Sequence, residues 1–163
     1  MKKITYPVIS IIILILITAC AEYKPIYTTD LQFRISDYSI KSNKKLGRQI
    51  YSKLYNLSQF SKGNAEVQNV NIIIDAKKDK QATAKDSTGK ILEYRIILNS
   101  DIIIKDYLTN EDILNQNFSY SSTYKVQDQY SETIKLENKS IENLINKIYQ
   151  NLIIKMSETM LTQ

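Results

Sequence analysis

The strongest constraint on the fold is a sustained alternation of apolar and polar side chains between residues 92 and 105. On one side of this segment lie mostly apolar side chains, namely Leu92, Tyr94, Ile96, Leu98, Ser100, Ile102 and Ile104. On the other side lie Glu93, Arg95, Asn99, Asp101 and Lys105. Successive side chains of a β-strand point to opposite faces of its sheet, so the pattern predicts a long strand with one buried face. One wet face is typical of an antiparallel sheet.

Three further segments have the same period of two. A short first strand is predicted around Leu31, Phe33 and Ile35, and a second from about Val67 toward Lys85. A turn at residues 86–90 joins the second strand to the third, with Gly89 providing positive φ. After another turn at 109–112, a fourth strand is predicted with one face made of Leu114, Gln116, Phe118, Tyr120, Ser122 and Tyr124. The last three strands therefore form a meander.

Two segments instead have the spacing of a helix. From about Ser42 to Lys62, an apolar residue recurs every three to four positions, at Leu46, Ile50, Leu54 and Leu57. Gly63-Asn64 provides a stop for this helix. A longer amphipathic helix begins near Asp128 or Ser131 and runs toward the C-terminus, with a kink near Asn138 or a frayed end. We therefore predict an α+β fold of order β-α-β-β-β-α, in which two helices pack on one face of a four-stranded, mostly antiparallel sheet.

The N-terminus has the features of a bacterial lipoprotein signal. Lys2 and Lys3 precede an apolar run of about ten residues that ends in Ile17-Thr18-Ala19-Cys20. A membrane-spanning helix needs roughly twenty apolar residues, so the run reads as a signal peptide. We expect residues 1–19 to be removed, Cys20 to carry covalent lipid, and residues 20–163 to form one domain behind a short tether. The alternative is a buried or stray cysteine behind an uncleaved anchor.

The composition excludes several classes of site. The 163 residues include no His, one Cys and three Gly, so the usual transition-metal clusters, His-dependent nucleophiles and glycine-rich phosphate loops cannot be built. We expect no cofactor apart from the lipid, and no enzymatic activity. A carboxylate hydrolase needs only two acids and stays open as an alternative. Its candidates are ordinary turn and strand-end acids, namely Asp101, Asp106, Glu111 and Asp112.

Positive charge is concentrated in one part of the chain. The whole sequence has a formal charge of +5, and the segment 41–63 contains six Lys and Arg residues without any Asp or Glu. Lys41, Lys44 and Arg48 are expected near the start of the first helix, where cations oppose the helix dipole. This asymmetry favours an anionic partner on one side of the molecule. The alternative is a merely solvated helix face.

The order of these elements and several short motifs resemble the LPS-assembly lipoprotein LptE family, in particular its alphaproteobacterial branch. That branch opens with Cys-Gly-Phe-x-Pro-Leu-Tyr, and the matching residues here are Cys20, Tyr23, Pro25, Ile26 and Tyr27, whereas Glu22 replaces the Gly. Further matches are the turn 86–90 followed by Tyr94-Arg95, the set Ser119-Tyr120 and Tyr124, and Tyr130-Ser131 at the start of the last helix. The resemblance covers the whole mature chain.

The resemblance implies a non-enzymatic role at the outer membrane. Members of the family plug the barrel of LptD, assist its assembly and are proposed to bind lipopolysaccharide (LPS) on its way to the outer leaflet. For this chain it implies a lipid-anchored, periplasm-facing protein whose partners are an LptD-type barrel, LPS and the membrane, and not nucleic acid. A periplasm-facing scaffold lipoprotein of another envelope machine is the alternative.

Basic side chains are the predicted contacts with LPS phosphates, because Lys and Arg bind such groups as charge pairs. The candidates are Lys77, Lys78, Lys85, Lys90 and Arg95 around the second and third strands, and then Lys41, Lys44, Lys45 and Arg48. For any single Lys, the alternative is a role in solubility alone.

Overall fold

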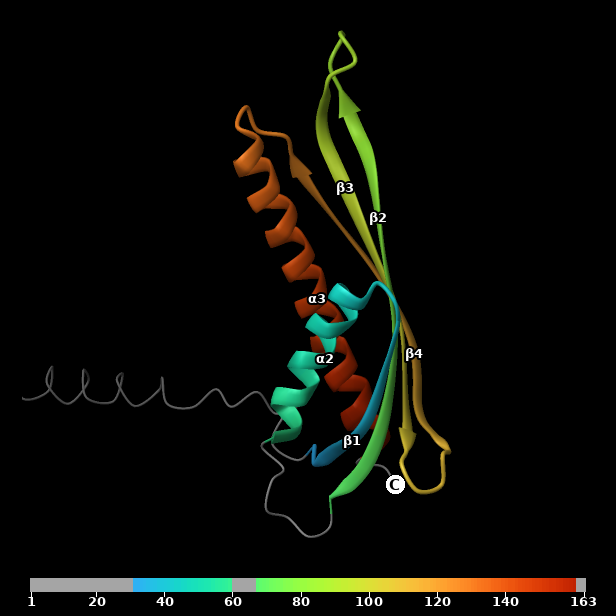
Figure 1. The fold of residues 1–163 in the computed structure, drawn as a ribbon. Coiled ribbons are helices and arrows are strands. Elements are labelled where there is room, and N and C mark those ends of the chain that lie inside the picture. The colour runs from blue at the N-terminus through green and yellow to red at the C-terminus, as the bar shows by residue number, and fades with distance from the viewer. Residues whose placement is uncertain (1–30, 60–66, 161–163) are drawn as a thin grey trace, which may run out of the picture.

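The computed structural model describes residues 31–59 and 67–160. Its elements are β1 (Phe33–Ser42), α2 (Lys44–Gln59), β2 (Gln68–Lys85), β3 (Ile91–Asp106), β4 (Asp112–Lys125) and α3 (Tyr130–Met160). This order and the α+β class confirm the prediction from the sequence (Figure 1).

The four strands form one sheet in the order β1-β2-β3-β4. β1 pairs with β2 in parallel, because the chain crosses over through α2 between them. β2, β3 and β4 are antiparallel neighbours joined by turns, as the meander predicted. In the first turn Gly89 has a φ of 87°, and the carboxylate of Asp86 accepts the backbone N–H of Thr88 and of Lys90.

Both helices lie on the same side of the sheet, and the core lies between them and it (Figure 1). The alternation in β2, β3 and β4 directs every second side chain of these strands into this core. The fully buried aliphatic side chains of the two central strands are Val70, Ile72, Ile74, Ala76, Ile96, Leu98, Ile102 and Ile104. They meet the stripe of α2 that contains Ile50 and Leu54, and the stripe of α3 that contains Ile148 and Leu152. We call the opposite surface of the sheet the open face.

The boundaries differ from the prediction in two places. β1 continues to Ser42, so Lys41 belongs to a strand and not to the following helix. The helix starts only at Lys44, where the side-chain oxygen of Asn43 accepts the backbone N–H of Leu46 and caps it. The predicted stop at residues 63–64 lies outside the described residues. α3 runs as one continuous helix through Asn138.

The inner row of β3 is shorter than its alternation suggests. Leu92 is 44% exposed and Tyr94 is only half-buried, although the pattern placed both in the core. The β2–β3 hairpin extends past the N-terminal end of α3, so no helix covers its tip (Figure 1). Periodicity identifies which face a side chain is on, but not how far along the strand the covering layer reaches.

Candidate functional site

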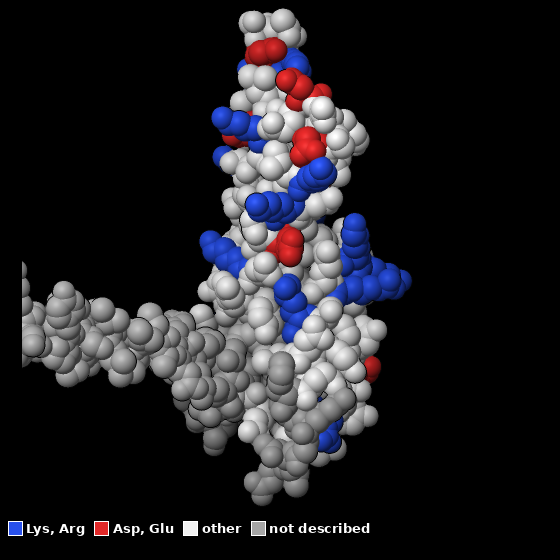
Figure 2. Space-filling view, turned by 90° about the vertical axis from the view of Figure 1, so that its left-hand side faces the viewer, with Lys and Arg blue, Asp and Glu red and all other residues white. Residues whose placement is uncertain are grey.

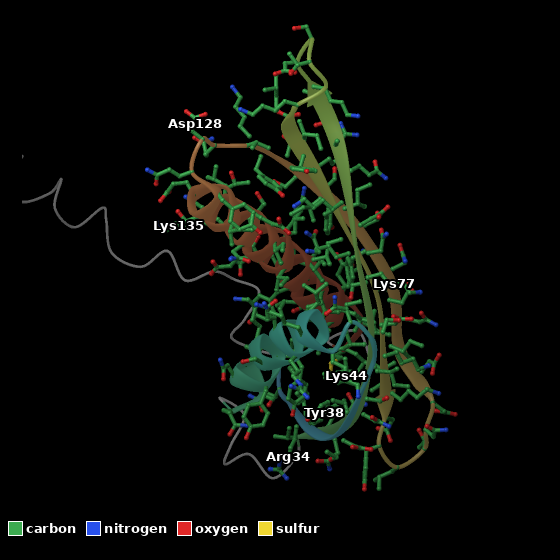
Figure 3. All side chains as sticks on the ribbon, turned by 45° about the horizontal axis from the view of Figure 1, so that its top comes forward. Arg34, Tyr38, Lys44, Lys77, Asp128 and Lys135 are labelled. Carbon is green, nitrogen blue, oxygen red and sulfur yellow. The ribbon has the colours of Figure 1, made fainter. Side chains whose placement is uncertain are left out.

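The open face of the sheet is the first candidate surface. Its side chains come from alternate positions of the strands and form cross-strand polar pairs. The side-chain amide of Asn117 on β4 donates to a carboxylate oxygen of Asp101 on β3, and the Ser119 hydroxyl donates to the Asn99 side-chain oxygen at 2.6 Å. Lys77, which forms an ion pair with Asp75 at 3.5 Å, points away from the helices on this side (Figure 3). The predicted wet face is therefore polar.

An aliphatic patch in the open face was missed by the sequence reasoning. Ile73 on β2 lies directly opposite Ile103 on β3, and both are half-buried. Ile97 on β3 is also half-buried. It points to the open face as well, nearer to the β2–β3 turn. The signal was present as the runs of three Ile at 72–74 and 102–104, because the middle residue of each run must point to the opposite face.

The predicted basic residues fall into separate groups. Lys41 on β1 and Lys77 on β2 lie on the open face, as does Arg95 on β3. Lys85 and Lys90 flank the hairpin turn at the tip of the sheet. Lys44, Lys45 and Arg48 are exposed on the first turns of α2. Lys78 points instead to the helix side of the sheet, where it meets α3.

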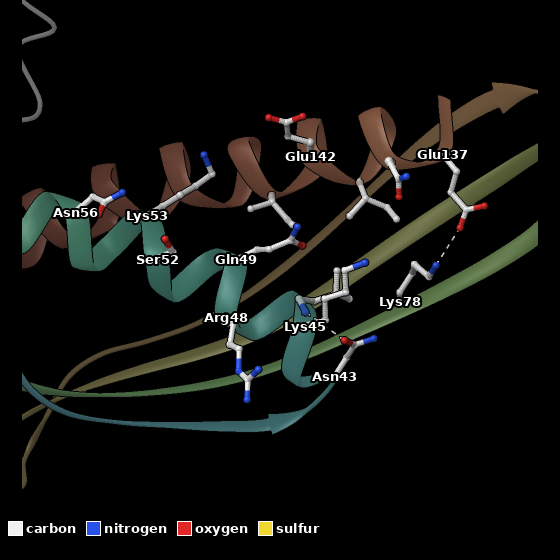
Figure 4. Close-up of a pocket in the computed structure, with 14 residues that line it drawn as sticks. Asn43, Lys45, Arg48, Gln49, Ser52, Lys53, Asn56, Lys78, Glu137 and Glu142 are labelled. Atoms are coloured by element: carbon white, nitrogen blue, oxygen red, sulfur yellow. Dashed lines mark hydrogen bonds and ion pairs between the residues drawn. The ribbon is translucent and has the colours of Figure 1, made fainter. Parts of the chain in front are cut away.

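A groove of about 700 Å³ between α2 and α3 brings three of these residues together (Figure 4). Lys45, Arg48 and Lys78 line it, and Lys53 adds a fourth cation that the prediction did not include. Leu46, Ile141 and Ile145 supply apolar surface, and Glu137 and Glu142 supply negative charge. Seen from the helix side, Lys and Arg side chains spread over the middle of the molecule with acidic ones among them (Figure 2). The groove can hold an anionic group beside an apolar one.

Glu137 of α3 organises one end of the groove. Its carboxylate accepts Lys78 Nζ at 3.0 Å, Lys80 Nζ at 2.6 Å and the Tyr124 hydroxyl at 2.8 Å. Lys80 Nζ also lies 4.2 Å from the centroid of the Tyr94 ring, a cation–π distance. We call Lys78, Lys80, Tyr94, Tyr124 and Glu137 the Glu137 network.

The Glu137 network shifts the titration of its members. Burial by itself would raise the pKa of Glu137, but hydrogen bonds from Lys80, Tyr124 and Lys78 outweigh it and lower this pKa to about 2. Burial would likewise lower the pKa of Lys80, yet its hydrogen bonds to Glu137 and Tyr124 raise that pKa. Lys78, a predicted LPS contact, is thus already engaged by an acid of its own chain.

The acids considered for hydrolysis have structural partners in this sheet. One Asp106 oxygen accepts the backbone N–H of Leu108 and of Thr109, and these bonds lower the pKa of Asp106. Asp112 forms an ion pair with Lys105 at 3.0 Å, and Asp101 accepts Asn117. Within residues 31–59 and 67–160, no cluster of three acidic or Cys side chains could hold a metal ion.

Cys20 and the predicted cleavage site lie outside the described residues. Across the part of the chain that the structure does describe, no helix combines the length and the apolar character needed to cross a membrane. The apolar faces of α2 and α3 are used within the domain.

Comparisons with known proteins establish the fold. No protein-family model and no curated protein matches the sequence. Among solved structures, a candidate lipoprotein from Caulobacter crescentus has a TM-score of 0.56 at 10% identity, covering 78% of this chain and 90% of its own. An uncharacterised lipoprotein B from Nitrosomonas europaea has a TM-score of 0.54 at 15% identity, covering 77% and 84%. Protein XCC0632 from Xanthomonas campestris has a TM-score of 0.56 at 8% identity, covering 85% and 91%. The chain thus shares its fold with proteins that include lipoproteins.

Proposed function

We propose that this chain is a non-enzymatic, lipid-anchored protein of the outer membrane that acts as an LptE-type partner of an LptD-type β-barrel and binds LPS during its delivery. The signal sequence ending at Cys20 supports the anchor. Two of the three structural neighbours described above are named as lipoproteins, which agrees with this reading. The single observation that carries the proposal is the composition of the open face.

The open face suits the inside of a hydrated barrel. Lumens of outer-membrane barrels are polar, so a plug needs a surface that offers many hydrogen-bonding groups and few apolar ones. The paired residues Asn99, Asp101, Asn117 and Ser119 provide such groups. The Ile73–Ile103 pair lies beside this row and provides a small apolar contact of the kind found at the centre of protein interfaces.

The groove between α2 and α3 suits the proposed LPS contact. LPS joins phosphates to acyl chains, and the groove places Lys45, Arg48 and Lys53 beside Leu46 and Ile141. Arg48 can pair with a phosphate through two parallel hydrogen bonds, whereas the lysines act as point charges. The groove therefore gathers three cations and apolar surface in one place.

Site-specific photo-crosslinking in cells tests the barrel partnership. A photoreactive residue at Asn99 or Asn117 should trap an outer-membrane barrel protein, because both side chains lie on the open face. The same residue at Ile96, which is fully buried under the helices, should trap nothing. Crosslinks confined to a soluble periplasmic protein, together with normal barrel assembly after depletion of the chain, would support the scaffold alternative instead.

Reversal of groove charges tests the LPS contact. The double variant Lys45→Glu and Arg48→Glu should weaken salt-sensitive binding of LPS by about tenfold, because exposed charge pairs contribute up to about 1 kcal/mol each. The matched control reverses Lys139 and Lys155, two exposed cations of α3 that do not line this groove. Equal weakening by both double variants would mean that LPS binds through overall charge and not through the groove.

A further inference from the structure

The two edge strands of the sheet differ in how they are protected. An edge strand presents unpaired backbone N–H and C=O groups, and soluble proteins block such edges with charges and bulges. β1 has both devices: its register shifts between Ile35 and Asp37, and it includes Arg34, Asp37 and Lys41. It also ends in positive φ at Ser42, which turns the chain away. A further strand is therefore disfavoured at this edge.

β4 has neither device along most of its length. It comprises 14 residues, and its charged residues, Asp112 and Lys125, stand at the two ends. The stretch Ile113–Tyr124 contains no charged residue, no Pro and no Gly. From Leu114 to Lys125 its pairing with β3 is regular. The one shift in register lies between Leu114 and Asp112, at the start of the strand. Over the described ranges, β3 is the only strand that pairs with it.

We propose that an extended segment of the protein partner adds to β4 as a fifth strand. A long, regularly paired and uncharged edge is a template for another strand, and main-chain hydrogen bonds are the basis of this kind of recognition. The inference rests on the proposed function, since it names how the partner attaches. It differs from the contact by the open face, because β4 binds through its edge and not through a surface of the sheet.

The charge beside β4 indicates which segment fits. Lys147 of α3 is exposed, and its Nζ lies 4.6 Å from the centroid of the Tyr120 ring, on the helix side of β4. No acidic residue occurs between Asp112 and Lys125 to balance it. The added strand therefore carries uncharged or acidic side chains, and no basic ones, on the side that faces α3.

The same lysine disfavours a second copy of this chain as the occupant. Two copies of β4 that pair about a two-fold axis are antiparallel, and pairing over the full length of the strand places the middle of one strand opposite the middle of the other. Tyr120 lies near the middle of the 14-residue strand, so two Lys147 side chains would meet close to the axis. Like charges at such a position oppose self-pairing. A different polypeptide avoids this repulsion.

A matched pair of variants tests the edge. Ser121 on β4 and Ser39 on β1 are both exposed serines on edge strands, and each lies opposite an isoleucine of its neighbouring strand. In the full lipidated chain, Ser121→Lys should weaken association with the barrel partner at least about tenfold, since Lys is a natural blocker of edges. Ser39→Lys puts the same charge on the open face at the other edge, opposite Ile73, and should weaken association less than Ser121→Lys does. Equal weakening by the two variants would assign the effect to the open face and overturn the strand-addition proposal. Melting temperatures of both variants verify that each is folded.

Hydrogen exchange in the complex supplies an independent measurement. About half of the amides of an edge strand point out of the sheet and exchange quickly. Binding should roughly double the number of slowly exchanging amides in the peptide 112–125 and leave the peptide 33–42 unchanged. Protection of 112–125 that rises with the concentration of the chain alone would overturn the proposal in favour of self-pairing.

The two proposals fail in distinguishable ways. If probes at Asn99 or Asn117 capture a barrel but Ser121→Lys binds it normally, or if exchange in 112–125 is unchanged in that complex, the strand-addition proposal is wrong and the proposed function stands. If no probe captures a barrel, both are wrong.

Discussion

The two halves of β2 differ in how the same strand is attached to the helices. In the first half the inward side chains Val70, Ile72, Ile74 and Ala76 are fully buried under α2 and α3. In the second half the corresponding positions are Lys78 and Lys80, which meet α3 through Glu137. Apolar burial thus holds the first half of β2 against the helices, and ion pairs with Glu137 of α3 hold the second half.

This difference assigns separate tasks to the two halves. Buried aliphatic area contributes about 25 cal/mol per Å² and is insensitive to pH, so the first half should determine most of the stability. The Glu137 network should contribute less to stability, and its contribution should depend on pH because its members are ionised. Removing one member would leave partly buried charges without partners. It also adjoins the groove proposed for LPS, because Lys78 and Glu137 belong to the network and also line the groove.

Replacement of one isoleucine in the first half should have the largest effect. Ile74→Ala should lower the free energy of unfolding by about 3 kcal/mol, because Ile74 is fully buried and a cavity replaces its side chain. Ile73→Ala is the matched control, one residue away on the open face, and should cost about 1 kcal/mol. Denaturant unfolding measures both. Similar losses would show that the open face is as tightly packed as the core.

A change in the second half should have a smaller effect that varies with pH. Glu137→Gln should lower the free energy of unfolding by about 2 kcal/mol near neutral pH, because Lys78, Lys80 and Tyr124 lose a charged acceptor whose side chain is only 12% exposed. Glu142→Gln, at an exposed position of the same helix, should change it by less than about 0.5 kcal/mol. Unfolding curves at several pH values measure both.

The pH dependence follows from the direction of the Glu137 shift. Its pKa is lowered from an ordinary value of 4.5 to about 2, so the folded state binds the proton more weakly than the unfolded state. The extra stability of the native chain over Glu137→Gln should be complete above pH 4.5. It should shrink as the pH falls from 4.5 through about 2, below which Glu137 is protonated in both states. A difference that stays constant over this range would contradict the role assigned to the carboxylate.

The sequence was sufficient for the elements and for most of the core, because period-two and period-3.6 patterns record which side chains a fold buries. It identified the inner rows of β3 and β4, including Ile96, Leu98 and Phe118, which are buried. It could not reveal that Leu92 is uncovered, since coverage depends on where α3 begins relative to the hairpin.

The candidate site was less predictable than the fold. The concentration of cations in segment 41–63 is visible in the sequence, but the groove depends on how α2 and α3 pack side by side. Glu137 lies 57 residues from Lys80, and no local pattern connects them. Sequence reasoning therefore treated Lys78 as a free ligand for LPS, whereas the structure shows it paired with Glu137. Interactions between distant elements decide which charges remain available.

The smallest expected effect concerns Gly47, which lets α2 approach β1 closely in the first half of the domain. A Cβ added at this buried glycine would overlap Cγ2 of Ile40 on β1. Such overpacking costs about 1–3 kcal/mol, and the better helix propensity of Ala returns up to about 1 kcal/mol. Gly47→Ala should therefore lower the free energy of unfolding by about 1 kcal/mol.

The sign of this effect should reverse when Ile40 is shortened. In an Ile40→Ala background the overlapping methyl group is absent, so Gly47→Ala should gain up to about 1 kcal/mol from helix propensity alone. A double-mutant cycle measured by denaturant unfolding isolates this coupling, because each single change is also measured by itself. An equal loss in both backgrounds would mean that Gly47 is needed for a reason other than contact with β1. A reversal would locate the close approach of helix and sheet at this one pair, Gly47 of α2 and Ile40 of β1.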